Sequence, residues 1–272
     1  MAFIVPNQRA SDRLTQPPGP RRDLELEQAI ASDAIDIHFQ PQIDPVSGHV
    51  LGVEALARWP GTESPQRLFE RAAAAGLTER LSRHVQRKAL RTAGAWKGPL
   101  KRLRLSINLL PEDLARAGFA RWLLTEIAVA RISPERLTVE ITESSLVSDR
   151  PQAAGRLARL RASGVEVAVD DFGTGYASLA YLTSLPLDAL KIDRGLIADL
   201  VGGTRDRIVV RAMIRLAREL GLKVVVEGVE SAAQLALVAE WGCDLYQGFL
   251  GAGALDEEEL ARFVGAANAM PA

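Results

Sequence analysis

The chain has 272 residues, of which 47% are apolar and 25% charged, and its formal net charge is −1. This composition is typical of a soluble globular protein with a substantial core, and it lacks the basic surplus that a general grip on DNA or RNA requires. The single cysteine, Cys243, excludes an intrachain disulfide, and three histidines argue against a zinc or iron site built mainly on imidazole. Any metal should therefore have oxygen ligands, which indicates Mg²⁺ or Mn²⁺.

The first 22 residues are rich in Pro, Arg and Gln, and we expect them to form a mobile tail. They differ from a signal peptide because their apolar piece is short and precedes the charges. No apolar run approaches the roughly 18 residues of a membrane span, so we expect no membrane insertion and a cytoplasmic location. Residues 23–272 show no internal linker and are expected to form one domain.

The first predicted elements are a helix and a pair of extended segments. Apolar spacing predicts a helix over residues 21–33. Residues 35–44 and 49–59 are predicted to be extended, and the intervening Pro45, Ser47 and Gly48 indicate a hairpin or a closely joined strand pair.

Two helices, at 64–75 and 78–96, are followed by a regular alternation of strands and helices. The predicted strands are 103–108, 136–142, 165–170, 189–193, 223–228 and 243–248. The predicted helices are 119–130, 153–163, 205–220, 231–241 and 257–264. This alternation predicts an α/β fold with a mainly parallel sheet, and the number of units favours a closed (β/α) barrel over an open sheet. The early strand pair suggests that one strand departs from the regular pattern.

Six successive strands of the predicted barrel end in a carboxylate, an amide or an amine. These residues are Asn108, Glu140, Asp170, Lys191, Glu227 and Gln247. A single polar strand end is equally well explained as the start of a solvated loop. In parallel barrels, however, catalytic groups lie at the carboxyl ends of the strands, and six such ends in succession favour a functional rim.

Asp170 and Asp171 are adjacent acids at the end of a buried strand, where unpaired charges are costly. In an ideal strand they would point to opposite faces. We expect the strand to fray after Asp170, with Gly173 and Gly175 permitting the turn that brings both acids to one site. Two metal ions about 4 Å apart would supply the compensating charge, and one Asp could bridge them.

Lys191 has two interpretations. An ammonium among several carboxylates could hold and polarise an attacking water. Alternatively, it could be a structural counter-ion to Asp193 or Glu227.

On the extended segment 49–59, Glu54, Leu56 and Arg58 share one face because side chains alternate along a strand. This face could contact a metal, a flat base and a phosphate. The alternative is an amphipathic strand on which Arg58 pairs with a surface acid.

Taken in order, the motifs of this chain resemble those of the EAL-domain phosphodiesterases that hydrolyse cyclic di-GMP. The matching motifs are FQP at 39–41, EALAR at 54–58, SIN ending at 108, EITE at 140–143, DDFGTGYASL at 170–179, KID at 191–193, VEGVE at 226–230 and QGF at 247–249. The resemblance covers roughly residues 24 to 265. "EAL" alone would mean nothing, whereas the ordered set is specific.

The resemblance implies a modified TIM-type (β/α)8 barrel with one antiparallel strand and two bound Mg²⁺ or Mn²⁺ ions. It implies hydrolysis of one phosphodiester bond of cyclic di-GMP, which gives linear 5'-pGpG. The implied metal ligands are Glu54, Asn108, Glu140, Asp170, Asp171, Glu227 and Gln247, with Asp170 bridging the two ions. The implied catalytic residues are Lys191, Glu227 and Glu54, the first two positioning the attacking water.

The same resemblance implies a substrate groove and a contact between subunits. The groove residues are Gln40, Leu56 and Arg58, with Asp193 and Glu230 as further candidates. Glu143 is implied to anchor the loop Phe172–Leu182, which in this family couples homodimerisation to metal binding.

The chain departs from the family pattern modestly, with Leu110 and Ala177 at positions where small polar residues are usual and no proline soon after Gln247. No implied metal ligand is missing, which argues against a non-catalytic cyclic di-GMP receptor of the same fold. A third possibility is an unrelated metal-dependent barrel enzyme, for example one acting on a carbonyl acid. No sensory module is recognisable, so regulation would come from dimerisation, a partner protein, the tail or expression.

Overall fold

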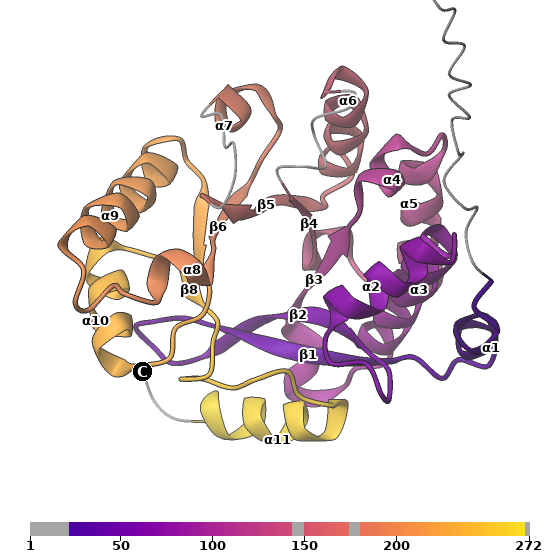
Figure 1. Cartoon of the computed structure of the whole chain (residues 1–272). Helices are drawn as coiled ribbons and strands as arrows, with labels where there is room; N and C mark the ends of the chain where they lie inside the picture. The colour runs from indigo at the N-terminus through magenta and orange to yellow at the C-terminus, as the bar shows by residue number, and fades with distance from the viewer. Residues whose placement is uncertain (1–21, 143–149, 174–179, 270–272) are drawn as a thin grey trace, which may run out of the picture.

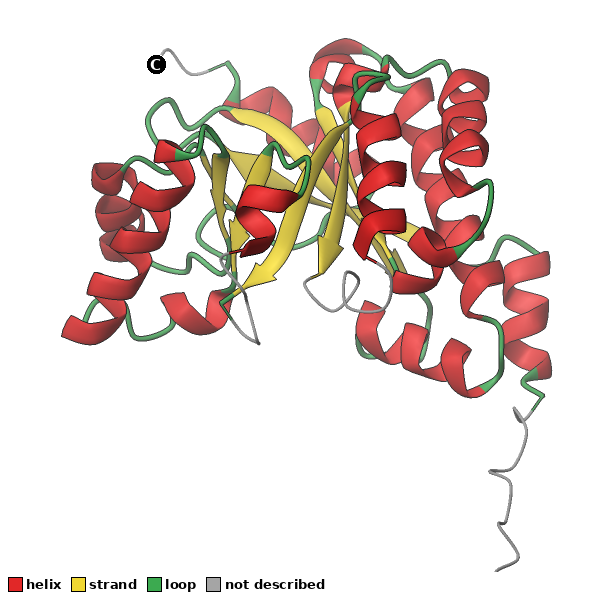
Figure 2. Ribbon diagram, turned by 90° about the horizontal axis from the view of Figure 1, so that it is seen from above, coloured by secondary structure: helices red, strands yellow, loops and turns green. Residues whose placement is uncertain are grey.

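Eight strands close into a barrel in chain order within the residues that the computed structural model describes, 22–142, 150–173 and 180–269. The strands are β1 (Asp36–Ile43), β2 (Val50–Arg58), β3 (Arg104–Leu109), β4 (Leu137–Thr142), β5 (Glu166–Phe172), β6 (Ala189–Ile192), β7 (Lys223–Val226) and β8 (Leu245–Tyr246). Figure 2 shows these strands at the centre of the molecule with helices around them. The predicted barrel is confirmed.

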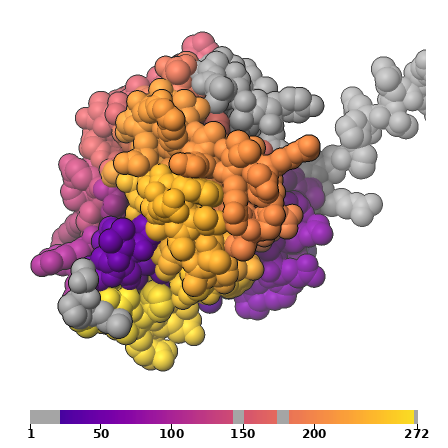
Figure 3. Space-filling model, turned by 90° about the vertical axis from the view of Figure 1, so that its left-hand side faces the viewer, coloured from indigo at the N-terminus to yellow at the C-terminus, as the bar shows by residue number. Residues whose placement is uncertain are grey.

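The helices follow the expected alternation and surround the sheet (Figure 1). They are α1 (Leu24–Ala31), α2 (Pro65–Ala74), α3 (Thr78–Ala95), α4 (Pro111–Ala115), α5 (Phe119–Ala130), α6 (Arg150–Arg161), α7 (Ala180–Ser184), α8 (Arg194–Ile197), α9 (Thr204–Glu219), α10 (Ala232–Trp241) and α11 (Glu257–Ala267). Short 3₁₀ turns, η1 (Gly98–Arg102) and η2 (Pro134–Arg136), precede β3 and β4. On the side shown in Figure 3, α9 and α10 lie next to each other.

β1 is the antiparallel strand of the barrel. It pairs antiparallel with β2 along its length and meets β8 antiparallel at Ile43 and Tyr246, whereas the other neighbouring strands are parallel. The turn between β1 and β2 is short because the Asp44 carboxylate accepts hydrogen bonds from the backbone N–H groups of Val46 and Ser47, both at 2.8 Å. The expected hairpin and the single departing strand are therefore confirmed.

Local capping explains where several helices begin. Ser64 accepts a hydrogen bond from the N–H of Arg67 at the start of α2, and Ser231 and Gln234 form a reciprocal capping box at α10. The short helices α4, α7 and α8 and the 3₁₀ turns η1 and η2 carry too few residues for a periodic apolar pattern and are not predicted from the sequence. β5 includes Phe172 and α7 begins at Ala180, so both ends of the predicted loop 172–182 lie in regular elements.

Along each strand, successive side chains point alternately toward the surrounding helices and toward the barrel axis. On β3, Leu105 and Ile107 are buried in the main hydrophobic core. Near the amino ends of the strands, Glu166 forms ion pairs with Arg104 at 2.6 Å and with Lys223 at 2.9 Å. The opposite end, where the parallel strands terminate, carries the polar rim predicted from the sequence.

Among the described residues, no helix combines the length and the apolar character that crossing a membrane requires. The predicted tail falls almost entirely outside the described residues, as do Glu143 and residues 174–179 of the predicted dimerisation loop.

Candidate active site

The ammonium group of Lys191 lies at the centre of four carboxylates at the carboxyl ends of the strands. Its Nζ is 2.6 Å from Glu140, 2.7 Å from Glu227, 3.2 Å from Asp170 and 3.3 Å from Glu54. The Lys191 side chain is only 1% exposed. Strands β2, β4 and β5, and the residue that directly follows β7, thus direct an acid toward one residue of β6. The counter-ion interpretation of Lys191 named Asp193 or Glu227 as its partner. Glu227 does contact Lys191, but three further acids contact it as well.

Two amides complete this cluster. The Asn108 Nδ2 donates to Glu54 Oε1 at 2.8 Å. The Gln247 Nε2 donates to Glu54 Oε2 at 2.8 Å and to Glu227 Oε1 at 3.0 Å. All six polar strand ends identified in the sequence therefore meet at one rim, together with Glu54.

The pair Asp170–Asp171 reaches this rim by a route that the sequence did not suggest. β5 does not fray after Asp170; its pairing resumes between Phe172 and Ile192, with an irregularity between Val169 and Phe172. Asp171 itself makes the turn, with a positive φ of 54°. Aspartate tolerates this left-handed conformation better than most residues, and the Asp171 N–H donates to Asp170 Oδ1 at 2.9 Å. The expected fraying is therefore wrong, because a bulge inside the strand performs the turn.

The acids form two overlapping triads. In one, Glu54, Glu140 and Asp170 place carboxylate oxygens within 4.8 Å of one another, and in the other Asp170, Asp171 and Glu227 do the same. Asp170 belongs to both. Carboxylate oxygens are the ligands that Mg²⁺ and similar hard cations take, so the donor set fits divalent metal ions.

Electrostatic effects in the cluster follow from burial and from the excess of acids over the one ammonium. Burial raises the pKa of Glu227 to about 8, opposed by Lys191 and reinforced by Asp170 and Glu54. Burial also raises the pKa of Asp171 to about 6, assisted by Asp170 and Asp193. Although burial opposes ionisation of Glu54, Lys191, Gln247 and Asn108 together lower its pKa. Extra cationic charge would therefore be favourable here.

Burial dominates the pKa of the two remaining acids of the cluster, Glu140 and Asp170. It raises the Glu140 pKa well above the ordinary value and raises that of Asp170, in both cases against the field of Lys191. Lys191 itself has a pKa well above its ordinary value, because the four acids outweigh its own burial. The cluster thus retains a charged ammonium while its acids compete for ionisation.

The predicted groove residues on β1 and β2 extend from this cluster. Gln40 lies opposite Glu54 in the β1–β2 register. Leu56 and Arg58 are half-buried on the face that carries Glu54, as the alternation predicted. Within the described part of the chain Arg58 forms no ion pair with a surface acid; its Nη1 donates to the backbone oxygen of Ala57 at 3.0 Å, and its electrostatic neighbour is Glu54.

Two weaker groove candidates lie outside the group of acids around Lys191. Asp193 caps α8, accepting a hydrogen bond from the Gly195 N–H at 2.7 Å, although its charge still acts on Asp171. Glu230 is exposed and immediately precedes Ser231, the N-cap of α10.

Sequence reasoning missed two buried amides that support the site. Gln42 donates to Gln247 Oε1, and its position two residues after Gln40 on a strand could have placed it on the same face. Gln86, from α3, donates to the Asn108 backbone oxygen at 3.2 Å and to Asp113 at 2.9 Å. Nothing in the sequence signals this second contact, since it depends on how α3 packs across β3.

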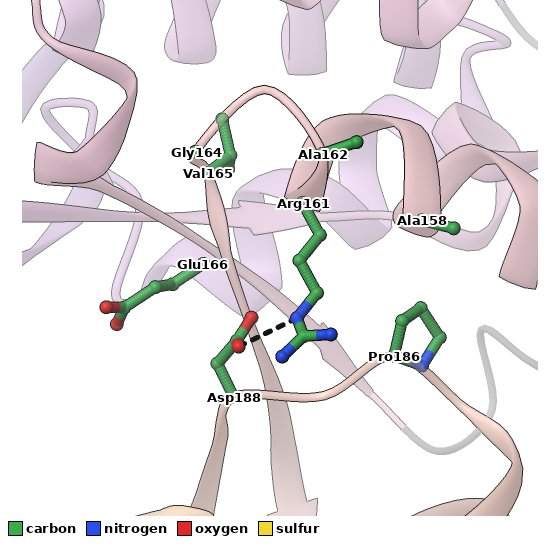
Figure 4. A pocket seen from close by; sticks show the side chains of 8 residues that line it. All are labelled: Ala158, Arg161, Ala162, Gly164, Val165, Glu166, Pro186 and Asp188. Atoms are coloured by element: carbon green, nitrogen blue, oxygen red, sulfur yellow. Dashed lines mark hydrogen bonds and ion pairs between the residues drawn. The ribbon is translucent and has the colours of Figure 1, made fainter.

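A pocket of about 440 Å³ lies away from the acids, where β5 and β6 begin. Figure 4 shows that Arg161 and Asp188 point toward each other in it, while Glu166 points elsewhere. The Arg161 Nε lies 2.8 Å from Asp188 Oδ1, so the cation of this pocket is already neutralised. We assign it no role in the chemistry of the rim.

Comparison with known proteins points to one family. The model of the EAL domain matches residues 23–254. The chain is 40% identical over 231 residues to the cyclic di-GMP phosphodiesterase NbdA of Pseudomonas aeruginosa. The alignment covers 83% of this chain and 30% of NbdA. The chain therefore spans less than a third of this relative.

Solved structures agree with the sequence comparison. The cyclic di-GMP complex of the PaMucR phosphodiesterase matches with a TM-score of 0.81 and 35% identity, covering 87% of this chain and 98% of that one. The manganese and cyclic di-GMP complex of Klebsiella pneumoniae BlrP1 matches with a TM-score of 0.74 and 31% identity, covering 82% of this chain and 56% of that one.

Proposed function

The chain belongs to the EAL domain family, and from this premise we propose that it is a phosphodiesterase that hydrolyses cyclic di-GMP to linear 5'-pGpG. The observation that carries the proposal is the pair of acidic triads that share Asp170 around the buried Lys191. A receptor that only binds the nucleotide has no need of a complete acid set with a central ammonium. The names of NbdA and PaMucR support the same substrate class.

We propose that two divalent cations, Mg²⁺ or Mn²⁺, bind at the triads. One would take Glu54, Glu140 and Asp170, with Asn108, which donates to Glu54, as a further ligand through its amide oxygen, and the other would take Asp170, Asp171 and Glu227. When bound, such ions supply Lewis-acid activation of the phosphoryl group and lower the pKa of water. The manganese complex of BlrP1 supports this choice of metal.

The remaining chemistry falls to residues of the chain itself. Lys191 and Glu227, 2.7 Å apart, hold the attacking water, and Glu227 accepts its proton. As the water oxygen bonds to phosphorus, the bond between phosphorus and the 3'-oxygen breaks. That oxygen leaves as a hydroxyl after taking a proton from solvent, to which Glu227 later releases the proton it accepted. Glu227 suits this role because its carboxylate lies beside the Lys191 ammonium, where it can accept a proton from a water held by the two groups.

The resemblance implies that Gln247 is a metal ligand. We propose instead that Gln247 is a hydrogen-bond donor to two of the carboxylates. Its Nε2 faces Glu54 and Glu227, and an amide nitrogen with its hydrogens is no metal ligand. Gln247 thereby fixes two carboxylates relative to each other.

The substrate would lie across β1 and β2. Arg58 is suited to a phosphate because a guanidinium presents several donors, Leu56 to a base face, and Gln40 to a polar group of the nucleotide. Asp193 and Glu230 remain candidates at the periphery. From the resemblance alone we also propose a homodimer through the loop 172–182, anchored by Glu143, and regulation by dimerisation or by a partner protein.

The test is a product chromatogram. The purified chain is incubated with cyclic di-GMP and Mg²⁺ or Mn²⁺, beside reactions with Ca²⁺ and with EDTA. We expect pGpG with Mg²⁺ or Mn²⁺, none with EDTA, and binding with little turnover with Ca²⁺, which prefers more ligands at longer distances. Calorimetric binding without product under any metal would instead support the non-catalytic receptor. Absence of both binding and product would exclude the two functions together.

A further inference from the structure

A second buried side-chain amide, that of Gln42, contacts Gln247. Gln42, on β1, is only 4% exposed, and its Nε2 lies 3.3 Å from Gln247 Oε1 and 3.5 Å from Ser106 Oγ. The contact exists because the antiparallel β1 closes the barrel against β8, with Ile43 beside Tyr246. Gln42 touches no carboxylate of the cluster by a described hydrogen bond. Its effect on the acids therefore passes through Gln247.

The contact determines which atom of Gln247 the acids meet. The side-chain amide of glutamine can be turned by 180°, which exchanges its oxygen and nitrogen. Because Gln42 donates to the oxygen, the nitrogen is left to donate to Glu54 and Glu227. In the turned state the Gln247 oxygen would face two carboxylates, and its nitrogen would face the donor group of Gln42. Both contacts would be repulsive.

Gly52 provides the space for Gln42. The two residues are partners in the β1–β2 register. A Cβ atom at position 52 would lie 2.8 Å from Gln42 Oε1, closer than such contacts are found. Its next neighbours, on Arg104, would be at ordinary distances of 3.4 and 3.5 Å. A methyl group at position 52 would therefore displace the Gln42 amide and little else.

We infer that Gln42 is a positioning residue, which locks the Gln247 amide with its nitrogen toward Glu54 and Glu227. The inference rests on the proposed function for its effect on turnover. Its structural content, the orientation of Gln247, does not depend on the substrate. Gln42 is distinct from Gln40, the proposed groove residue, which precedes it by two positions on the same face of β1.

The experiment compares the full chain with Gln42→Met, which keeps the shape and removes the amide. ¹⁵N-labelled glutamine side chains are observed in metal-free protein, with the Gln247 signal assigned by its loss in Gln247→Leu. We expect the Gln247 signal to move or broaden in Gln42→Met. With Mn²⁺ and cyclic di-GMP, kcat should fall about tenfold while KM changes less than twofold, since positioning of the reacting groups is lost and the groove is intact.

A pair of variants separates positioning from simple loss of packing. Gly52→Ala alone should shift the Gln247 signal and lower kcat as Gln42→Met does. In a Gln42→Ala background the same Gly52→Ala change should have less than a twofold further effect, because the displaced amide is gone. An additive effect of Gly52→Ala, or an unchanged Gln247 signal in Gln42→Met, would overturn the inference. Lowered thermal stability with unchanged kcat and signal would do the same.

The two proposals fail differently. If the wild-type chain produces no pGpG but Gln42→Met moves the Gln247 signal, the proposed function fails and the positioning of Gln247 stands. If wild-type turnover is present and Gln42→Met retains both kcat and the signal, the positioning fails and the function stands.

Discussion

Lys191 Nζ lies 2.6 Å from Glu140 Oε2, and each side chain is 1% exposed. This buried pair is shared with three further acids, so the ammonium is the main positive charge holding the cluster together among the described residues. Removing one partner of a buried ion pair leaves uncompensated charge and is far more costly than removing a surface pair.

We predict that Lys191→Met abolishes most of the activity and destabilises the metal-free protein. The acids lose their counter-ion, and the loss of unfolding free energy should be about 3–5 kcal/mol. Denaturant unfolding in EDTA measures this, and initial rates with Mn²⁺ should fall at least 100-fold. Lys223→Met is the matched control, because Lys223 pairs with Glu166 near the amino ends of the strands and is half-exposed. A Lys191→Met protein with a rate within tenfold of wild type would contradict the role of Lys191.

Glu227 provides a prediction on pH. Its folded-state pKa of about 8 is raised from 4.5, mainly by burial, so its protonated form favours folding. The stability that it supports is complete below pH 4.5 and is lost as the pH rises toward 8. In EDTA, the Tm of wild-type protein should therefore fall more between pH 5.5 and 8.5 than that of Glu227→Gln. Parallel Tm profiles for the two proteins would contradict the raised pKa of Glu227. Both proteins contain the same histidines, so any effect of histidine titration on Tm is common to the two profiles.

The site could be predicted from the sequence where a functional residue directly follows an apolar run. Asn108, Glu140 and Lys191 lie near the carboxyl ends of β3, β4 and β6, each directly after an apolar residue, so strand period and barrel geometry suffice to bring them together. Gln86 could not be predicted, because its contact with the Asn108 backbone oxygen depends on how α3 packs across β3, which no motif signals. The turn at Asp171 was also missed, since glycines downstream offered a more obvious turn than a positive φ at an acid.

Asp171 combines this strained backbone with a proposed metal ligand, and two substitutions separate the two properties. Asp171→Asn keeps a residue that tolerates a φ of 54° but removes the charge, so its stability in EDTA should match or exceed that of wild type. Asp171→Ala should cost about 1 kcal/mol relative to Asp171→Asn, because alanine lacks this tolerance. In calorimetric titrations with Mn²⁺, both variants should bind one ion tightly instead of two. Retention of two tight sites in both variants would remove Asp171 from the ligand set.

A substitution at Gly248 tests whether close packing against the Val229 backbone holds Gln247 in place. A Cβ at Gly248 would lie 2.3 Å from the Val229 oxygen and 2.4 Å from its nitrogen, and both atoms belong to backbone that cannot rotate away. Gly248→Ala should therefore lower the unfolding free energy by about 1–3 kcal/mol, the cost of forcing atoms into a packed site. It should also lower kcat, because the displaced segment carries Gln247, whose backbone oxygen accepts a hydrogen bond from the Val229 N–H at 3.1 Å.

Gly265→Ala is the matched control, since a Cβ there meets nothing within 4 Å and the residue lies inside α11. Alanine in a helix interior is favoured over glycine by about 0.5–1 kcal/mol, so this variant should be slightly more stable than wild type with an unchanged kcat. Denaturant unfolding and initial rates measured on both variants decide the matter. If Gly248→Ala is as stable and active as Gly265→Ala, the contact with Val229 does not constrain Gln247, and the amide must be held from the side of Gln42 alone.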